Sequence, residues 1–283
     1  MNAQQQLLTR IISCCEENEE VRALILIGSQ VRAEFHADAY SDLDLIMIVN
    51  DISRFIQSND WVDEIGRHHV SFIEQTIGGQ EERRILFDDA LDVDFVLISE
   101  AIAQAALASK DALSILSKGY KFLVNKENIT IPDQDIINTG EYEHPSASEY
   151  INVVNDFWYH TIWTAKKLLR GELWAANFCV NNYMKQKLLW MIEHYEHTIH
   201  GSNYNTWYGG RFIDTWADDN VKERLAKAFS NYNATDLASA LIETMDLFRI
   251  IAVKVGHTYK YNYPVHADEY CTSWVSDKLY NHV

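Results

Sequence analysis

The side chains with the clearest chemical potential are two aspartates, Asp42 and Asp44, in the segment SDLDLIMIV. They are two residues apart, so on an extended strand both carboxylates point to the same face. Neighbouring carboxylates repel one another unless a cation lies between them. A hard divalent ion such as Mg²⁺ prefers oxygen ligands and completes its shell with substrate phosphates. The spacing therefore predicts a metal site that serves phosphoryl chemistry.

A third acid, Asp94, interrupts the apolar run VDFVLI. An acid inside such a run destabilises the fold unless a cation or strong hydrogen-bond donors accompany it. We predict that Asp94 joins Asp42 and Asp44, either as a further metal ligand or as a general base. Asp92 points to the same face of the expected strand and is the alternative.

A glycine and a serine follow the first apolar run of the chain, residues 24–27. Gly28 has no Cβ, so the backbone can turn tightly there and a bulky anion can approach it. Ser29 adds a hydroxyl, and backbone amides that lead into a helix favour phosphate. We predict that this turn binds the phosphates of a nucleotide.

These side chains need strands to position them, and the first half of the chain supplies the patterns. We predict strands over residues 21–27, 43–49, 70–75 and 120–124, and a hairpin over residues 84–98 whose second strand is 91–98. We predict helices over residues 4–17, 52–58, 100–107 and 111–116. The result is a nucleotide-handling domain over residues 1–140, with a mixed β-sheet and helices on one side. The polar segment 125–145 holds two of the three prolines and is the predicted linker.

From Ser146 onward the apolar residues recur with the period of a helix. Ser146 and Glu149 match a capping box, and Gly171 suits a helix C-terminus. We predict helices over residues 147–170, 172–197, 218–230, 235–256 and 267–281, with a loop at 201–210. The fold class is therefore α+β, with a C-terminal helical-bundle domain over residues 141–283. We expect the substrate site in a cleft between the two domains.

Composition limits the functions that the chain can have. The 283 residues carry a formal net charge of −17, which argues against nucleic acid as a partner because phosphate contacts need clustered lysine and arginine. The same charge suits a polycationic small molecule, although acidic surfaces also simply keep proteins dispersed. No apolar run is long enough to span a membrane, and the N-terminal residues lack a signal peptide's apolar core. We therefore expect a cytoplasmic protein with no membrane partner; its oligomeric state stays open.

The Gly-Ser turn, the Asp-x-Asp strand and the later strand acid together resemble the nucleotidyltransferase superfamily related to DNA polymerase β. Residues 155–195, the YGGRF turn at 208–212 and the late TMDLFRIIAVKVG segment are similar to the helical domain of aminoglycoside 6-adenylyltransferases, the streptomycin-modifying group. The resemblance covers nearly the whole chain, in order. It departs at Gln30, where the family usually has arginine, and at Leu43, where the family tends to have an aromatic residue.

This resemblance implies transfer of AMP from ATP to a hydroxyl of an aminoglycoside such as streptomycin, with release of pyrophosphate and Mg²⁺ as the metal. The strands that bear the site carry only acids, so cations elsewhere must offset the triphosphate. Lys185 and Arg211 fall where the family has basic residues, which implies that they bind the nucleotide; Lys187 lies on the same helix as Lys185. Asp156 falls at an acidic family position and is predicted to bind an amino or guanidino group of the acceptor.

Two other functions are compatible with the sequence. The first is a nucleotidyltransferase with a different acceptor, such as a protein hydroxyl, as in enzymes paired with helical toxins. The second is a non-catalytic protein that senses a drug or a nucleotide. An assay of several aminoglycosides with labelled ATP distinguishes a protein acceptor from drug modification. ATP binding without pyrophosphate release would indicate the non-catalytic protein.

Overall fold

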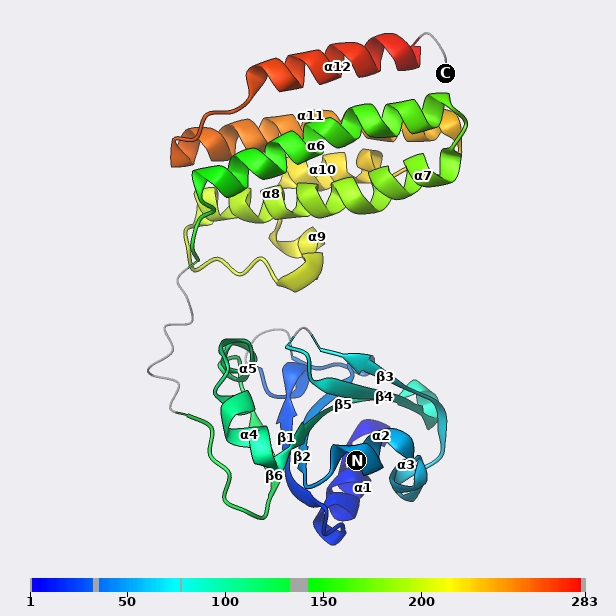
Figure 1. The fold of residues 1–283 in the computed structure, drawn as a ribbon, viewed down its shortest axis with the longest axis vertical. Helices are drawn as coiled ribbons and strands as arrows, with labels where there is room; N and C mark the ends of the chain where they lie inside the picture. The colour runs from blue at the N-terminus through cyan, green and yellow to red at the C-terminus, as the bar shows by residue number, and fades with distance from the viewer. Residues whose placement is uncertain (1, 33–35, 77, 133–141, 281–283) are drawn as a thin grey trace. The chain divides into compact units, whose positions relative to one another are not determined.

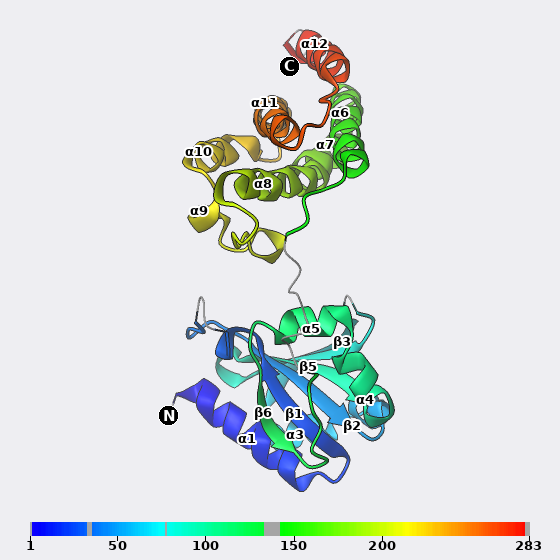
Figure 2. The same cartoon turned by 90° about the vertical axis from the view of Figure 1, so that its left-hand side faces the viewer.

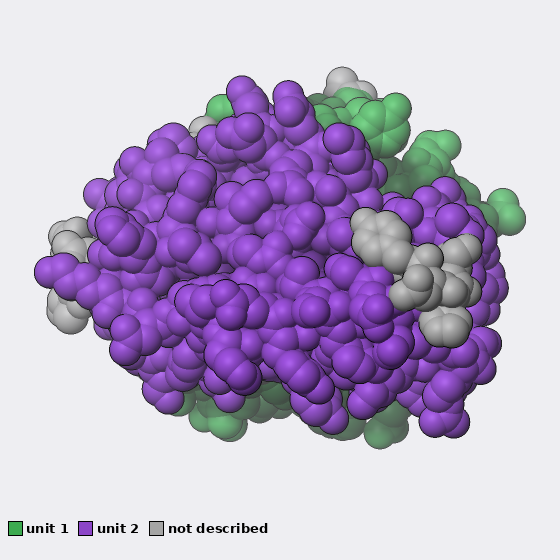
Figure 3. Space-filling view, turned by 90° about the horizontal axis from the view of Figure 1, so that it is seen from above, with its two compact units in different colours: residues 1–139 green, residues 140–283 purple. Residues whose placement is uncertain are grey.

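The computed structural model describes residues 2–32, 36–76, 78–132 and 142–280. The chain forms two compact units, Met1–Thr139 and Gly140–Val283 (Figure 3). The domain boundary that we predict at residue 140, and part of the predicted linker 125–145, lie outside the described residues. Among the described residues, no helix combines the length and the apolar character that crossing a membrane requires.

The N-terminal unit is built on a mixed sheet of six strands in the order β3-β4-β5-β2-β1-β6 (Figures 1 and 2). The strands are β1 Val21–Ile27, β2 Leu43–Val49, β3 His68–Gln75, β4 Glu81–Phe87, β5 Asp92–Ser99 and β6 Lys121–Asn125. Strands β2 and β5 are parallel, and the other paired strands are antiparallel. The predicted mixed sheet and the predicted hairpin, which is β4 and β5, are confirmed.

Helices cover both faces of this sheet, so the prediction of helices on one side is wrong (Figure 2). One face carries α1 Ala3–Glu17, α2 Ile52–Gln57 and α3 Asp60–Ile65, and the other carries α4 Glu100–Leu107 and α5 Lys110–Leu116. The physical reason lies in the central strands: Leu45 and Met47 are buried on the first face, while Ile46 and Ile48 are buried on the second. A strand that is apolar on both sides needs a cover on both.

The C-terminal unit is helical, as predicted. Its helices are α6 Ala147–Leu169, α7 Leu173–Phe178, α8 Met184–His200, α9 Ile213–Trp216, α10 Asp219–Ala228, α11 Ala234–Tyr259 and α12 Val265–Tyr280. The predicted capping box is present, with the Glu149 amide donating to Ser146 Oγ at 3.2 Å. Phe157 of α6 stacks on Phe248 of α11 with 3.6 Å between ring centroids. These two long helices therefore pack directly against one another in the core.

The predicted single helix over residues 172–197 is in fact interrupted. A π-helical turn, Cys179–Tyr183, separates α7 from α8. A π-helical turn contains an extra residue, so the side chains after it are rotated relative to those before it. Tyr183, the last residue of the turn, is thereby directed toward α6, where its hydroxyl meets Asp156.

A charged network attaches α12 to α11. Arg249 donates from Nε to Asp268 Oδ2 at 2.7 Å and from Nη2 to Asp268 Oδ1 at 2.8 Å. The Asp268 side chain is 9% exposed, and Tyr263 also donates to it. We expect Arg249→Met to lower the free energy of unfolding by about 2–4 kcal/mol, because a nearly buried carboxylate loses its charged partner. Urea denaturation measures this loss.

Arg170→Met is the control for this prediction. Arg170 also pairs with a carboxylate, that of Glu172, but its side chain is 73% exposed. Exposed ion pairs contribute less than about 1 kcal/mol, so this variant should unfold nearly as wild type does. Equal losses in the two variants would show that burial of Asp268 does not determine the stability of the network.

Candidate active site

The register of the sheet places the key side chains in one row. Asp44 of β2 pairs with Asp94 of β5 on one side and with Ile27 of β1 on the other, and Asp94 pairs with Arg84 of β4. Directly paired residues project to the same face of a sheet. Asp44, Asp94 and Arg84 therefore share a face. Strand β1 ends beside Asp44, at Ile27, and Gly28 follows it.

The three predicted aspartates converge. Carboxylate oxygens of Asp42, Asp44 and Asp94 all lie within 4.8 Å of one another, and each of the three side chains is partly exposed. They lie on the face that α4 and α5 cover farther along β2 and β5. Three carboxylates this close form an oxygen-rich, negatively charged group of ligands that suits a hard divalent cation.

Arg84 is a residue of this site that our sequence reasoning missed. Its Nε is 3.6 Å from Asp94 Oδ2, and its Nη2 is 2.9 Å from Glu82 Oε2. The strand next to β5 thus brings a guanidinium to the carboxylates, so the expectation that only acids line the site is incomplete. Arg84 is visible in the hairpin sequence, but its position beside Asp94 depends on the register between β4 and β5.

Asp94 is held in an environment that disfavours its charge. Burial raises its pKa to about 6; Arg84 opposes this increase, while the negative charges of Glu82 and Asp42 add to it. Without a metal, Asp94 is therefore protonated at a pH where an ordinary aspartate is ionised.

This environment predicts a gain of stability from Asp94→Asn in the metal-free protein. The folded protein keeps the Asp94 proton up to about pH 6, whereas the unfolded chain releases it near pH 4. The free energy of unfolding therefore falls as the pH rises through this window and stays lower above it. At pH 7.5 the asparagine variant should be more stable by on the order of 1–3 kcal/mol.

Denaturation in the presence of EDTA at pH 4 and pH 7.5 tests this difference. The two proteins should differ much less at pH 4, where Asp94 keeps its proton in the folded chain and is about half protonated in the unfolded chain. A variant that is no more stable than wild type at pH 7.5 would show that Asp94 ionises without cost.

The turn after β1 approaches the carboxylates closely. Residues Gly28–Gln30 form one turn of 3₁₀ helix, and Gly28 has a φ of +71°. A Cβ built on Gly28 would lie 1.9 Å from Asp44 Oδ2, so no larger residue fits without moving that carboxylate. Ser29 is 5% exposed, and its Oγ and the Gln30 Nε2 are buried without a hydrogen-bond partner among the described residues. Such polar groups are costly unless a ligand pairs with them, and phosphate oxygens would do so.

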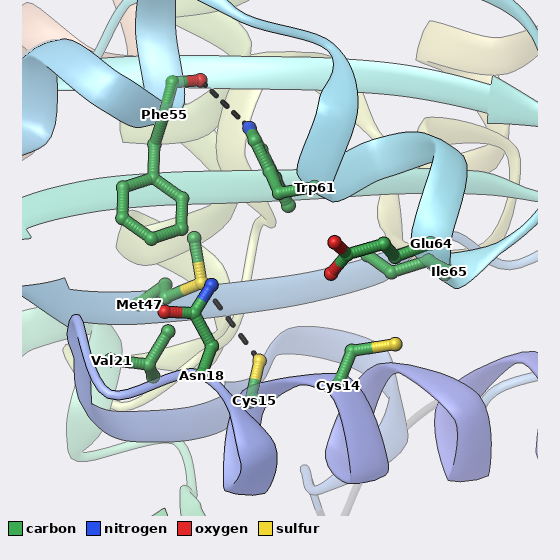
Figure 4. Close-up of a pocket in the computed structure, with 9 residues that line it drawn as sticks. All are labelled: Cys14, Cys15, Asn18, Val21, Met47, Phe55, Trp61, Glu64 and Ile65. Carbon is green, nitrogen blue, oxygen red and sulfur yellow. Dashed lines mark hydrogen bonds between the residues drawn. The ribbon is translucent and has the colours of Figure 1, made fainter.

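A small cavity in the same unit (Figure 4) lies on the face of the sheet opposite to the three aspartates. Met47 of β2 lines it, and alternation along the strand points Met47 away from the face that carries Asp44. The Trp61 indole donates to the Phe55 carbonyl, and the Cys15 thiol contacts the Met47 sulfur. This cavity is a gap in the packing between α1, α3 and the sheet, and the candidate site lies on the other face.

Asp156, the predicted acceptor-binding residue, lies on α6 within a polar cluster. Its carboxylate accepts two contacts from the Tyr183 hydroxyl, at 2.9 and 3.0 Å. It also pairs with Lys187 Nζ at 2.9 Å and with His160 Nδ1 at 2.7 Å.

The two basic residues predicted to bind the nucleotide differ in exposure. Arg211 is exposed on the loop before α9, and its carbonyl accepts a hydrogen bond from the Trp216 indole. Lys185 is 9% exposed, and its ammonium donates to the Val180 carbonyl at 3.1 Å and to Thr244 Oγ1 at 2.7 Å. Burial lowers the Lys185 pKa to about 7. In this conformation Arg211 presents its charge to solvent and Lys185 does not.

A glycine-serine turn beside paired aspartates on a mixed sheet, followed by a helical unit, is the arrangement of a nucleotidyltransferase. The model of the streptomycin adenylyltransferase family matches residues 1–278, and the chain belongs to this family. The resemblance inferred from the motifs is therefore confirmed, and so is the α+β fold class.

Curated relatives match over nearly their whole length. An aminoglycoside 6-adenylyltransferase of Bacillus subtilis (strain 168) is 23% identical over 273 residues, covering 93% of this chain and 94% of the relative. Another aminoglycoside 6-adenylyltransferase, from Staphylococcus aureus, is 22% identical with the same coverage. A crystal structure of an aminoglycoside 6-adenyltransferase from Bacillus subtilis covers 98% of this chain and 99% of its own, with a TM-score of 0.47 and 20% identity.

Proposed function

We propose that this protein transfers AMP from ATP to a hydroxyl of an aminoglycoside such as streptomycin and releases pyrophosphate. The names of its relatives support the substrate class. The observation that carries the chemistry is the convergence of Asp42, Asp44 and Asp94 within 4.8 Å. Such a reaction would inactivate the drug and so confer antibiotic resistance.

The three carboxylates are the groups that would hold Mg²⁺. When bound, this ion neutralises the charge on the triphosphate and lowers the pKa of the acceptor hydroxyl. Ser29 Oγ and Gln30 Nε2, which are buried without partners among the described residues, donate to phosphate oxygens. Arg84, 3.6 Å from Asp94, offsets part of the negative charge of the site.

The reaction is an in-line displacement at the α-phosphorus. The acceptor oxygen bonds to phosphorus, the bond to the bridging oxygen breaks, and pyrophosphate leaves with that electron pair. Asp94 either accepts the proton of the hydroxyl or serves as a metal ligand. The protein's main contribution is to position the two substrates.

The helical unit supplies groups for both substrates in this proposal. Asp156 binds an amino or guanidino group of the acceptor, and the acidic chain as a whole attracts polycations. Arg211 is the more accessible partner for the nucleotide. Lys185 would first have to leave Val180 and Thr244.

Mass spectrometry of streptomycin incubated with the protein, ATP and Mg²⁺ tests the proposal. We expect drug that carries one added adenylyl group, with pyrophosphate released in equal amount. If a panel of aminoglycosides stays unmodified while labelled AMP appears on protein, the acceptor is a protein hydroxyl. If ATP binds and no pyrophosphate forms, the protein is a non-catalytic binder.

A further inference from the structure

The side chains around Asp156 form a cage for a cation in the helical unit. We define the Asp156 cage as Asp156 and His160 of α6 with Tyr183 of the π-helical turn. His160 Nδ1 is 2.7 Å from Asp156 Oδ1, and its ring centroid is 4.3 Å from that of Tyr183. The Tyr183 hydroxyl donates to both carboxylate oxygens. A carboxylate beside aromatic rings is the combination that recognises ammonium and guanidinium groups.

The cage already contains a cation, and the chain itself provides it. The Lys187 ammonium is 2.9 Å from Asp156 Oδ2 and 5.2 Å from the centroid of the Tyr183 ring. It therefore makes both contacts that a bound ammonium ligand would make, one with the carboxylate and one with the ring face.

We propose that the Asp156 cage is the subsite for an ammonium or guanidinium group of the acceptor, and that Lys187 fills it until the acceptor displaces it. This inference rests on the proposed function. It makes Lys187 a competitor of the acceptor for Asp156, and not a residue that binds the phosphates of the nucleotide.

The exchange is physically easy for this lysine. The side chains of Lys187 and Asp156 are 27% and 20% exposed, so solvent and solutes reach the pair. The lysine stem is flexible and its ammonium is well hydrated in water, so Lys187 can leave Asp156 and place its charge in solvent. Burial raises the Asp156 pKa, but hydrogen bonds from Lys187 and Tyr183 outweigh it and hold the pKa below its ordinary value. A guanidinium can then bind both carboxylate oxygens at once, which an ammonium does less well.

Calorimetry of the full chain with streptomycin, without nucleotide or metal, tests the proposal. Lys187→Met removes the competitor and keeps a side chain of similar length. We expect it to bind streptomycin roughly three- to tenfold more tightly than wild type, the range for a partly exposed ion pair with a ring contact. Asp156→Asn should weaken binding, and more so in the Lys187→Met background, where the cage is open.

Lys222→Met is a matched control. Lys222 also pairs with an aspartate, Asp219, at 2.7 Å, and its side chain is 29% exposed. The substitution changes the net charge by the same amount and should leave streptomycin affinity nearly unchanged. Equal gains in the two variants would show a general charge effect and would overturn the proposal.

The outcomes separate this inference from the proposed function. If Lys187→Met folds normally and binds streptomycin no more tightly than wild type, the cage is only a packing contact between α6 and the π-helical turn, even if AMP transfer occurs. Agmatine, a small guanidinium compound, serves as a second probe. If both probes bind more tightly to Lys187→Met and no transfer to streptomycin is found, the Asp156 cage is a cation subsite and the proposed function is wrong.

Discussion

Asp42→Asn and Asp44→Asn should each lower the rate of AMP transfer by at least about 10³-fold. Asparagine keeps the size of the side chain but removes one negative charge and one strong metal ligand from a cluster of three. Both residues are partly exposed, so we expect little change in the fold, which circular dichroism and thermal unfolding would verify. Single-turnover assays with labelled ATP measure the rate.

Asp92→Asn is the control within the same sheet. Asp92 is exposed at the start of β5, two residues from Asp94, and it is not part of the cluster of converging carboxylates. This variant should retain nearly normal turnover. Near-normal turnover of Asp42→Asn or Asp44→Asn would contradict the metal assignment.

Gly28→Ala should have the second large effect, on both activity and stability. The new methyl group would lie 1.9 Å from Asp44 Oδ2, so either the turn or the carboxylate must move. A displacement of about 1 Å at a reacting centre can lower the rate about 100-fold. Backbone strain at positive φ and overpacking together should lower the free energy of unfolding by roughly 2–4 kcal/mol.

Gly171→Ala separates the effect of backbone strain from that of a steric clash with Asp44. Gly171 has a φ of +74°, close to that of Gly28, but a Cβ there would meet no atom within 4 Å. We expect a loss of stability of about 1–2 kcal/mol from strain alone, with activity unchanged. If Gly28→Ala behaves like Gly171→Ala in both measurements, the close approach to Asp44 has no functional importance.

Local patterns were sufficient to predict the strands that carry the site. The predicted ranges 21–27 and 43–49 coincide with β1 and β2. These are short apolar runs that end at Gly28 and begin after Asp42, and such runs with clear boundaries have few alternative structures. The predicted hairpin and most helices also agree with the structure to within a few residues.

Long-range pairing could not be predicted from local patterns. The contact between Asp44 and Asp94 depends on parallel pairing of β2 with β5, and Arg84 reaches Asp94 only through the register of β4. A one-residue change of register would have placed Arg84 on the opposite face. The Arg84 guanidinium was therefore missed, although Arg84 and Asp94 belong to the same hairpin.

The helical unit shows the same limit. Lys185 has the sequence pattern of a solvated lysine, but its partner Thr244 is 59 residues away and the core around it is formed by several helices. The π-helical turn has no simple sequence signature, so the direction of Tyr183 and the cage that it completes became visible only in the structure.

The most direct test of the central claim is Mn²⁺ binding followed by electron paramagnetic resonance, with α,β-methylene-ATP as a nucleotide that cannot transfer AMP. Mn²⁺ replaces Mg²⁺ at oxygen sites and is observable directly. We predict that wild type binds Mn²⁺ together with the nucleotide and that Asp44→Asn loses this binding. Equal Mn²⁺ binding by wild type and Asp44→Asn would contradict the claim that these aspartates hold a divalent ion beneath the nucleotide's phosphates.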